Sequence, residues 1–344
     1  MMKITTKRVF ALQLLVMLMC GSATAQRTVT YPDVHDPVLA YEDGTYYMFT
    51  TGNGVGIMKS EDNMQSWQYL PGALRTPPQW AVESVGGYRG HTWAPDIYHH
   101  DGIWYLYYSC SSFGKNESAI GMATNTTLNP SSPAYKWEDQ GAVVRSFKET
   151  NWNAIDPNLI MDKKGNPWLT WGSFWDGIQI VQLEKDFITP IGEPKTIARR
   201  YAPNNGTNNI SEEDLKRSAA APQAGSNAIE APFIIKEGKY YYMFVSWDYC
   251  CKGLNSNYKV VVGRSKRVDG PYLDKDGVPL DQGGGTLLLG PDERYAGIGH
   301  CSVYDFGDGW RIFCHAYDKQ HNGASKLFTR RVIFDSEGWP FVAY

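Results

Sequence analysis

The chain has 344 residues, with 33 Lys and Arg against 36 Asp and Glu, which gives a formal net charge of −3. A nucleic-acid-binding surface normally needs an excess of basic residues, so this balance argues against nucleic acid as a partner. Aromatic residues make up 14% of the chain and 34 residues are Gly. This composition disfavours a helical bundle or a coiled coil and is typical of an all-β protein with many turns.

The N-terminus has the pattern of an export signal. Three basic residues come first, an apolar run follows from residue 9 to 19, and Ala23-Thr24-Ala25 supplies the small residues of a cleavage site. A membrane span needs about 20 apolar residues, so the run is too short for an anchor. We therefore expect residues 1–25 to be a signal peptide and the mature protein to be periplasmic or extracellular, without a membrane span. Lipidation of Cys20 is the less favoured alternative, because a Met directly precedes it.

Five cysteines follow the signal segment: Cys110, Cys250, Cys251, Cys301 and Cys314. An odd number in a chain of this length is no disulfide framework. No CxxC or HExxH spacing indicates a zinc site. For the adjacent Cys250 and Cys251 we expect two buried thiols, with a strained bridge between them as the alternative.

A repeated pattern runs along the rest of the chain: a polar head residue, a Gly turn, an aromatic strand and a further strand-like run. The head residues are Asp36, Asp96, Asp156, Glu230 and His300, at spacings of 60, 60, 74 and 70 residues. A repeat of this length with several strands corresponds to one propeller blade. We therefore predict an all-β fold in which residues 26–344 form a single-domain, five-bladed β-propeller. A generic β-sandwich is the alternative, but it does not explain why the head residues recur in phase.

The strands are expected at similar places in every copy. The aromatic strands are predicted at residues 46–49, 104–108, 168–171, 240–244 and 310–313, and the strands after them at 56–58, 119–122, 177–181, 260–263 and 327–329. Between the third and fourth copies, residues 199–227 form the one stretch of low complexity. We interpret it as an insertion that either covers the substrate mouth or is an inert surface loop.

The head residues are expected to converge. A residue at the first position of an inner strand points toward the propeller axis, and four of the five heads are acidic. Converging carboxylates repel, so burial, hydrogen bonds or a metal must drive their pKa values apart. A protonated carboxyl group beside an ionised one is the apparatus of glycoside hydrolysis. A single Asp-Pro is normally a strand-entry turn, but the recurrence in register favours a catalytic site.

Several motifs extend beyond the head residues themselves. The head motifs are Val34-His35-Asp36-Pro37, Thr92-Trp93-Ala94-Pro95-Asp96, Ala154-Ile155-Asp156-Pro157 and Ile229-Glu230-Ala231-Pro232. Further motifs lie at residues 172–178, 246–253, 262–265, 270–272 and 299–303. The head motifs resemble those of family-43 glycoside hydrolases, which are five-bladed propellers, and the others resemble the arabinanase branch of that family. The resemblance covers residues 31–344.

The resemblance implies an inverting endo-acting hydrolase that cleaves internal α-1,5-L-arabinofuranosidic bonds of plant arabinan and arabino-oligosaccharides. Asp36 corresponds to the general base that activates water. Glu230 corresponds to the general acid, and Asp156 to the carboxyl group that keeps the pKa of the acid raised and orients it. Inversion implies that the carboxyl groups of Asp36 and Glu230 lie roughly 6.5–9.5 Å apart.

Other residues are predicted to bind an ion or the sugar. The resemblance places His300 near a calcium or similar ion at the axis, held largely through waters, with no organic cofactor; a His that fills the axis without metal is the alternative. Asp96 is expected to orient this His or to line the −1 pocket. Trp93, Phe113 and Phe174 are predicted sugar platforms, since a furanose ring packs on an aromatic face. Asn153, Ser173 and Arg264 are candidates for hydroxyl contacts, and Arg264 alternatively holds a catalytic carboxylate.

Two alternatives remain open. An exo-acting arabinanase, or an arabinofuranosidase or β-xylosidase of the same family, would have a pocket closed at one end. Many xylosidase-like relatives carry an extra C-terminal domain, which we do not expect here. A carbohydrate-binding propeller without catalysis is a function of another class, and the three carboxylates argue against it. We expect a monomer.

Overall fold

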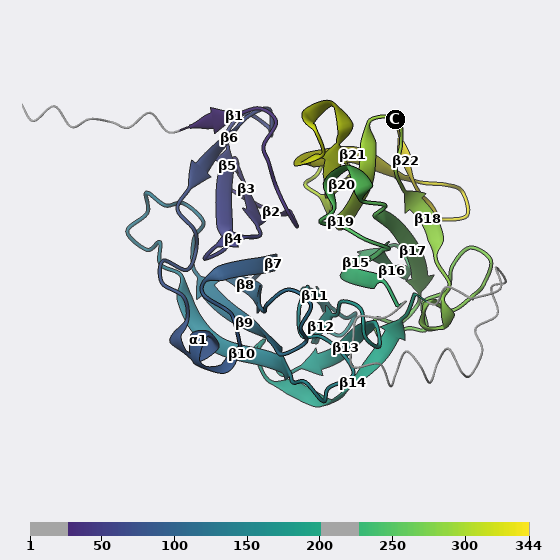
Figure 1. Ribbon diagram of the computed structural model, residues 1–344, viewed down its shortest axis with the longest axis horizontal. Coiled ribbons are helices and arrows are strands. Elements are labelled where there is room, and N and C mark those ends of the chain that lie inside the picture. The colour runs from purple at the N-terminus through teal and green to yellow at the C-terminus, as the bar shows by residue number, and fades with distance from the viewer. Residues whose placement is uncertain (1–26, 201–226, 344) are drawn as a thin grey trace, which may run out of the picture.

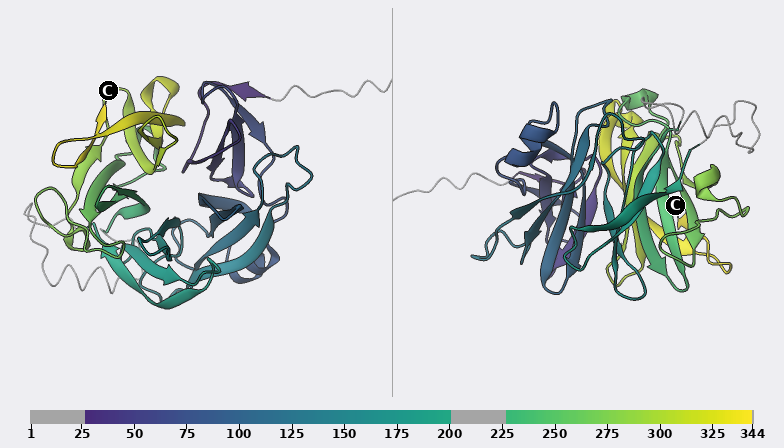
Figure 2. Two further views of the ribbon diagram at one scale, coloured as in Figure 1. Left: turned by 180° about the vertical axis from the view of Figure 1, so that it is seen from behind. Right: turned by 90° about the horizontal axis from the view of Figure 1, so that it is seen from below.

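The computed structural model describes residues 27–200 and 227–343. Five sheets follow one another around a central axis, and the strands labelled β2, β7, β11, β15 and β19 in Figure 1 lie toward the centre. Seen from the side, the strands run largely along this axis (Figure 2). The predicted five-bladed propeller is therefore confirmed, and a two-sheet sandwich is excluded. The predicted signal peptide and most of the insertion at 199–227 lie outside the described residues.

Each blade is an antiparallel sheet of four or five strands. Blade 1 contains β1 (Thr28–Val29), β2 (Val38–Glu42), β3 (Thr45–Thr50), β5 (Gly56–Ser60) and β6 (Trp67–Leu70). Blade 2 contains β4 (Gly52–Asn53), β7 (His91–His100), β8 (Ile103–Cys110), β9 (Ser118–Asn125) and β10 (Glu138–Ser146). Blade 3 contains β11 (Asn158–Met161), β12 (Pro167–Trp171), β13 (Ile178–Leu183) and β14 (Pro190–Ala198).

The two remaining blades have four strands each. Blade 4 contains β15 (Ile229–Glu237), β16 (Tyr240–Trp247), β17 (Lys259–Ser265) and β18 (Thr286–Leu289). Blade 5 contains β19 (Tyr295–Asp305), β20 (Trp310–Asp318), β21 (Ala324–Phe334) and β22 (Pro340–Ala343). The helical segments of the described chain are short: α1 (Gln79–Ser84), η1 (Gly253–Asn255), η2 (Leu280–Gln282) and η3 (Lys319–His321). None of these has the length and apolar character that a membrane crossing needs.

The aromatic strands and the strands after them form where they were predicted. The aromatic runs become β3, β8, β12, β16 and β20, which pair with the inner strands β2, β7, β11, β15 and β19. The turns that precede them are tight. Asp43 and Gly44 have φ values of 47° and 82°, and Asp101 and Gly102 have 48° and 77°. Two successive positive φ values define the type I′ turn, which matches the twist of a hairpin and favours Asp-Gly.

The core lies between neighbouring blades. Tyr107 and Met122 of blade 2 pack with Leu159 and Trp171 of blade 3 in one buried cluster. A second cluster joins blades 3 and 4 through aliphatic and aromatic side chains of β13, β15, β16 and β17. Most of the Tyr and Trp residues thus fill the space between sheets, and burying each large side chain contributes roughly 2–3 kcal/mol.

The N-terminal segment closes the ring. The N–H of Val34 donates to the carbonyl oxygen of Ser325 at 3.1 Å, and the N–H of Leu327 donates to that of Pro32 at 3.1 Å. Asp33 bridges Lys326 in the same antiparallel pairing. The chain therefore runs along β21 of blade 5 before it enters blade 1, which holds the first and last blades together.

The backbone opens every blade in the same way. One residue in the inner strand or just before it has a positive φ, between 39° and 60°, and these residues are Asp36, Ala94, Asp156, Ala231 and His300. The N–H of each one donates, at 2.8–3.2 Å, to a side chain of the preceding blade. In the same order, the acceptors are His315, Thr51, Ser109, Asp156 and Ser246. Each hydrogen bond contributes about 1 kcal/mol, so the five links form a modest but continuous ring around the axis.

This repeat corrects the register of the predicted head residues. Asp36, Asp156 and His300 occupy equivalent positions, as expected. In blade 2 the equivalent residue is Ala94, two positions before Asp96, and in blade 4 it is Ala231, one position after Glu230. The sequence pattern aligned the acidic side chains, whereas the backbone conformation aligns the residues with a left-handed φ.

Asp96 is consequently a structural residue and not a sugar or ion ligand. It is 2% exposed, and its Oδ2 accepts from the N–H of Leu159 at 2.7 Å and from Nδ2 of Asn158 at 3.3 Å. Asn158 in turn accepts from the N–H of Ile234 at 2.8 Å. Asp96 therefore belongs to a second set of links between blades 2, 3 and 4, and the expectation that it orients His300 or lines the −1 pocket is wrong.

The buried carboxyl group of Asp96 gives stability a defined pH dependence. Burial raises the pKa of Asp96 from 3.8 to about 7, so the folded protein keeps a proton that the unfolded chain releases above about pH 4. The free energy of unfolding should fall by about 4 kcal/mol from this group as pH rises through that window. Asp96→Asn removes the titrating group and should flatten this part of the curve in urea unfolding at a series of pH values.

The matched control is Asp43→Asn, because Asp43 lies in an exposed turn where Asn tolerates the positive φ. That variant should keep the wild-type pH dependence. If Asp96→Asn and the wild type lose stability in parallel between about pH 4 and 7, the assignment of this slope to Asp96 is contradicted.

Candidate active site

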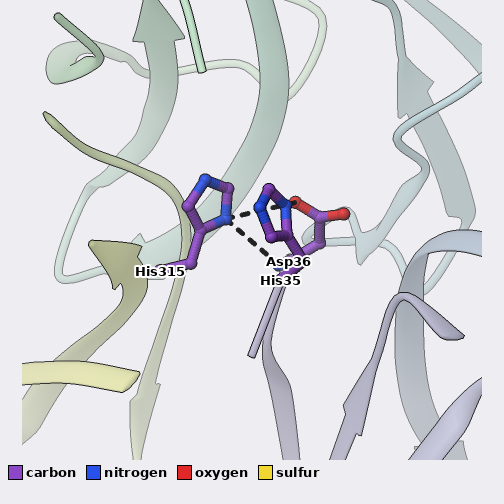
Figure 3. Close-up of side chains that lie close together, drawn as sticks. All are labelled: His35, Asp36 and His315. Carbon is purple, nitrogen blue, oxygen red and sulfur yellow. Dashed lines mark hydrogen bonds and ion pairs between the residues drawn. The ribbon is translucent and has the colours of Figure 1, made fainter. Parts of the chain in front are cut away.

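Asp36 lies at the centre of a group of polar side chains near the axis. Its Oδ2 accepts from the hydroxyl of Thr51 at 2.5 Å. Its Oδ1 lies 3.0 Å from Nδ1 of His300 and 3.3 Å from Nδ1 of His315. Figure 3 shows the imidazole of His315 directed at Asp36, with His35 beside it. The rings of His35 and His315 have centroids 4.0 Å apart, so the carboxylate is enclosed by three imidazoles.

Two of these imidazoles, His300 and His315, have opposite charge states. Burial alone would lower the pKa of His300, but the charge and hydrogen bond of Asp36 outweigh it and raise that pKa to about 10. Burial and the nearby His35 lower the pKa of His315 to about 3. A neutral His315 can accept at Nδ1 from the N–H of Asp36, at 3.2 Å. Although burial opposes ionisation of Asp36, the charge of His300 and the hydrogen bonds hold its pKa well below the ordinary value.

Asp156 has the opposite state. It is buried, and burial together with the charges of Glu230 and Asp36 raises its pKa well above the usual range, with His300 opposing. Its Oδ2 accepts from the N–H of Ala231 at 3.2 Å. The surroundings therefore shift the pKa values of Asp36 and Asp156 in opposite directions, as the sequence predicted for converging acids.

A glycine makes the link between Asp156 and blade 4 possible. Thr170 pairs with Asn158, and two residues further on the chain reaches Gly172. In each of the other four blades, the residue at the position of Gly172 has a side chain that accepts a hydrogen bond from the next blade. These residues are Thr51, Ser109, Ser246 and His315. Gly172 has φ +139°, and a Cβ there would lie 2.4 Å from the carbonyl oxygen of Gly177. Because blade 3 has no side chain at this place, the N–H of Ala231 is left for Asp156.

Glu230 is held by neighbours from two blades. Ser173 of blade 3 donates to Oε2 at 2.6 Å, and Tyr258 of blade 4 donates to Oε1 at 2.7 Å. The thiol of Cys250 lies 3.7 Å from Oε1. Glu230 is only 8% exposed. The carboxyl group therefore has one defined orientation, with both oxygens in contact with groups that carry a proton.

The predicted aromatic platforms lie on the same side of the ring as these carboxyl groups. Trp93 directly precedes Ala94 and is half-buried, with its indole N–H donating to His91 at 2.9 Å. Phe113 follows β8 beyond Ser109 and is 83% exposed. Phe174 follows Ser173 and lies 5.8 Å from Tyr249, measured between ring centroids. These positions are compatible with sugar contacts, which stay predictions.

The predicted polar contacts have different surroundings. The hydroxyl of Ser173 is used by Glu230, so this residue positions the acid. Asn153 is 3% exposed, and its Oδ1 is buried without a hydrogen-bond partner. Arg264 packs over Tyr240 and Trp339 and donates to the carbonyl oxygens of Glu337 and Gly338.

Arg264 is therefore misassigned as a substrate or carboxylate contact. It pairs with Tyr242 of β16, whereas Glu230 pairs with Ser246 of the same strand. Four residues of strand separate these two rungs by about 13 Å. Its side chain links the outer parts of blades 4 and 5, at the far end of β16 from the acid.

Sequence reasoning missed the groups that support the carboxylates. His315, Thr51 and Tyr258 were not predicted as site residues. His315 and Thr51 occupy the same place in their blades as Ser109 and Ser246. Each lies two residues after a residue of the aromatic strand that pairs with the inner strand. A polar residue that recurs at this place after the aromatic strand in four of the five blades is the signal that could have identified them.

The residues near His300 can be compared with the expected ion. The charges of Asp36, Asp156 and Glu230 all raise the pKa of His300, so this region favours a cation. A ligating imidazole must be neutral, and an ion would therefore replace the ring proton. Within residues 27–200 and 227–343, potential ligand atoms cluster at His35, Asp36 and His315. Two imidazoles and one carboxylate suit a transition metal better than calcium, so calcium beside His300 fits only with water as most of its ligands.

Comparison with known proteins agrees with this geometry. The model of the family described as glycosyl hydrolases family 43 matches residues 26–340. The chain belongs to this family. As a family-43 protein, it is a glycoside hydrolase, as predicted from the head motifs.

Relatives of the family-43 enzyme cover nearly its whole length. A solved structure of an exo-1,5-α-L-arabinanase from a bovine ruminal metagenomic library is 61% identical, with a TM-score of 0.84, over 92% of this chain and 98% of that one. The extracellular exo-α-(1→5)-L-arabinofuranosidase of Cellvibrio japonicus is 46% identical over 90% of this chain and 86% of its own length. The extracellular endo-α-(1→5)-L-arabinanase 1 of Bacillus subtilis is 40% identical over 89% and 87%.

The charge states of the two imidazoles can be measured directly in the family-43 enzyme. In protein freed of divalent ions, His300 should stay protonated up to about pH 10 and His315 should stay neutral down to about pH 3. Ring nitrogen and carbon-bound proton shifts in an NMR titration report both states separately. Two rings that titrate together near the ordinary His value of about 6.5 would contradict the assignment.

Proposed function

We propose that this enzyme hydrolyses α-1,5-L-arabinofuranosidic bonds of arabinan by single displacement with inversion. The observation that carries the proposal is the geometry around two carboxyl groups: Asp36 is held by Thr51 and the imidazole of His300, and Glu230 by the hydroxyls of Ser173 and Tyr258. The arabinan specificity is supported by the names of the relatives and by the arabinanase-like motifs in the sequence.

Asp36 is proposed as the general base. A base must be ionised before it can take a proton from water, and the imidazolium of His300 together with Thr51 stabilises that ionised form. Oδ2 is held by Thr51 and Oδ1 by the imidazolium of His300, so the carboxylate cannot rotate freely. The water that attacks the anomeric carbon would lose its proton to Asp36.

Glu230 is proposed as the general acid. Its Oε1 and Oε2 contact the hydroxyls of Tyr258 and Ser173, and a hydroxyl can accept as well as donate. Either oxygen can therefore carry the proton that passes to the leaving oxygen. Asp156 is proposed to influence this proton electrostatically, and its contact with the N–H of Ala231 anchors the peptide next to Glu230.

A calcium or similar ion near His300 is part of the proposal. His300 and water would hold it, and its charge would offset the acidic cluster. When bound, the ion would supply a fixed positive charge that stabilises the ionised form of Asp36. Its presence is supported by the acidic surroundings of His300.

We infer an exo mode of attack from the relatives. Of the three relatives named above, the two with the higher identity carry exo-acting names. The endo mode predicted from the sequence is the second candidate, and the Bacillus subtilis relative favours it. The insertion that could wall off one end of the pocket lies largely outside the described residues.

We also propose that the enzyme is exported and acts outside the cytoplasm on plant cell-wall arabinan. The N-terminal pattern of basic, apolar and small residues supports export. The Cellvibrio japonicus and Bacillus subtilis relatives are both named as extracellular.

Neutral isosteres of the two carboxylates should separate their roles. Glu230→Gln keeps the shape of the side chain but cannot donate the proton, and should lower kcat on linear arabinan about 10²- to 10⁴-fold. An aryl arabinoside with a good leaving group needs little acid assistance, so it should recover much of the rate. Asp36→Asn should lose activity to a similar extent without recovery on the aryl substrate.

Matched controls are available for both changes. Glu83→Gln and Asp43→Asn make the same chemical substitutions at exposed positions and should retain wild-type kcat. Near-wild-type turnover of Glu230→Gln on arabinan would contradict the acid assignment. Recovery of Asp36→Asn by the aryl substrate would contradict the base assignment.

The mode of attack follows from a product time course on debranched arabinan. Exo attack should release arabinose or a single short oligomer from the start, while the viscosity falls slowly. Mixed oligosaccharides with a fast fall in viscosity would contradict the exo mode and establish the endo mode. Xylan serves as the control substrate and should yield no product.

The proposed ion can be tested by the same NMR signals of His300. Addition of calcium to ion-free protein at neutral pH should shift the His300 ring resonances away from the imidazolium position and raise Tm. Removal with a chelator should reverse both effects. If saturating calcium changes neither the resonances nor Tm, the ion is not bound at this place.

A further inference from the structure

Two adjacent thiols lie against the proposed general acid. Cys250 and Cys251 follow β16, and their sulfur atoms are 2.8 Å apart. The Cys250 sulfur also lies 3.7 Å from Oε1 of Glu230. The proposed hydrolysis uses neither thiol. We propose that this pair is an oxidative modification site, which forms a vicinal disulfide in the exported protein and thereby withdraws the Cys250 S–H from Glu230. The second part rests on the role proposed for Glu230.

The loop is already arranged for this bond. A disulfide bond is about 2.05 Å long, so the two sulfur atoms need to approach by less than about 1 Å. Cys251 has a positive φ of 62°, and its N–H donates to the hydroxyl of Tyr317 at 2.6 Å. The N–H of Tyr249 donates to Asn257 at 3.0 Å. The backbone on both sides of the pair is therefore fixed by hydrogen bonds that do not involve the sulfur atoms.

Access and reactivity distinguish this pair from the other cysteines described. Cys251 is exposed and Cys250 is partly buried, whereas the other three thiols, Cys110, Cys301 and Cys314, are buried. The hydrogen bond from Cys250 and the nearby His35 lower the pKa of Cys251 to about 7, although burial opposes this. The thiolate is the nucleophile in disulfide exchange. Cys251 is thus the sulfur that an oxidant reaches first.

The oxidation is a thiol–disulfide exchange with a small disulfide or with the disulfide of an exported oxidoreductase. The Cys251 thiolate attacks one sulfur of the oxidant, and the other sulfur leaves as a thiolate. The attacked oxidant sulfur is now bonded to Cys251. The Cys250 sulfur, losing its proton, then attacks the Cys251 sulfur and displaces that oxidant sulfur as a thiolate. The two cysteines lose two electrons and two protons in total, and the oxidant disulfide becomes two thiols.

The resulting bridge should be easy to reduce. The Cα atoms of adjacent residues are about 3.8 Å apart, below the usual disulfide range of roughly 4.4–6.8 Å. A strained, exposed disulfide has a more oxidising potential and is labile. The modification is therefore reversible, and its state follows the redox conditions outside the cell.

Oxidation changes the surroundings of Glu230 in one respect. The groups that face Glu230 are the hydroxyls of Ser173 and Tyr258, the thiol of Cys250, the carboxyl group of Asp156 and the imidazole of His300. The single S–H of Cys250 is shared between Oε1 of Glu230 and the Cys251 sulfur. Oxidation removes it, so Oε1 keeps the hydroxyl of Tyr258 as its hydrogen-bond donor among these groups.

Peptide mapping of the full exported protein tests the disulfide. After alkylation of the native protein with N-ethylmaleimide, the peptide with Cys250 and Cys251 should carry no label and should be two hydrogen masses lighter than the dithiol. Mild reduction should add two labels to this peptide and none to the other three cysteines. Incubation of reduced protein with glutathione disulfide should restore the bridge. Two labels before reduction and after this incubation, or a bridge to another cysteine, would overturn the proposal.

The pH profile of kcat/KM on arabinan tests the effect on Glu230. The profiles of the oxidised and the reduced enzyme should differ by up to about threefold in kcat/KM, because one weak hydrogen bond to the carboxyl group is lost on oxidation. Cys250→Ala removes the S–H and should match the oxidised profile whether or not reductant is present. Cys251→Ser keeps the S–H and should match the reduced profile. Identical profiles of the oxidised and reduced enzyme would overturn this part.

The two proposals fail in different ways. Absence of arabinan hydrolysis in both redox forms would contradict the proposed function, and with it the effect on Glu230. The mapped masses decide the disulfide whether or not the protein hydrolyses arabinan. If either Cys variant fails to fold, comparison of the wild-type enzyme before and after reduction still decides the effect.

Discussion

The hydrogen bond from the N–H of a left-handed residue to the preceding blade is the contact on which the site depends. It occurs in all five blades, and in every case it fixes the start of an inner strand near the axis. Two of the left-handed residues are Asp36 and Asp156, so the links that assemble the ring also orient two carboxyl groups. Because each link contributes only about 1 kcal/mol, precision at the axis comes from their repetition together with the packed faces between the sheets.

The departures from the repeat create the chemistry. Blade 5 places His315 where blades 1, 2 and 4 have a hydroxyl, so Asp36 gains a neutral imidazole beside the charged His300. Blade 3 places Gly172 there, and Asp156 takes over the link to Ala231. The pKa of the buried Asp36 is thereby lowered, while that of Asp156 is raised. Different surroundings suit neighbouring carboxyl groups to different roles at the same pH.

The sequence was sufficient to predict the fold, but not to predict which residue of each blade holds the equivalent backbone position. Aromatic strands, Asp-Gly turns and recurring polar residues predicted five blades and the convergence of Asp36, Asp156 and His300. Asp96 was misassigned because an acidic residue after Ala-Pro resembles the others, although its backbone position is two residues later. His315 was missed because its contact with Asp36 spans 279 residues and closes the ring. Arg264 lies in a motif that resembles one of the arabinanase branch, and only the strand pairing shows that it is far from Glu230.

The most direct test of the account is the anomeric configuration of the first product. Proton NMR during hydrolysis of an α-1,5-linked arabino-oligosaccharide resolves the α and β anomers of the newly formed reducing end before they equilibrate. A base at Asp36 that activates water opposite the acid at Glu230 predicts that the β anomer appears first. Early appearance of the α anomer would mean that the reaction proceeds through a covalent intermediate, and would contradict the roles assigned to both carboxylates.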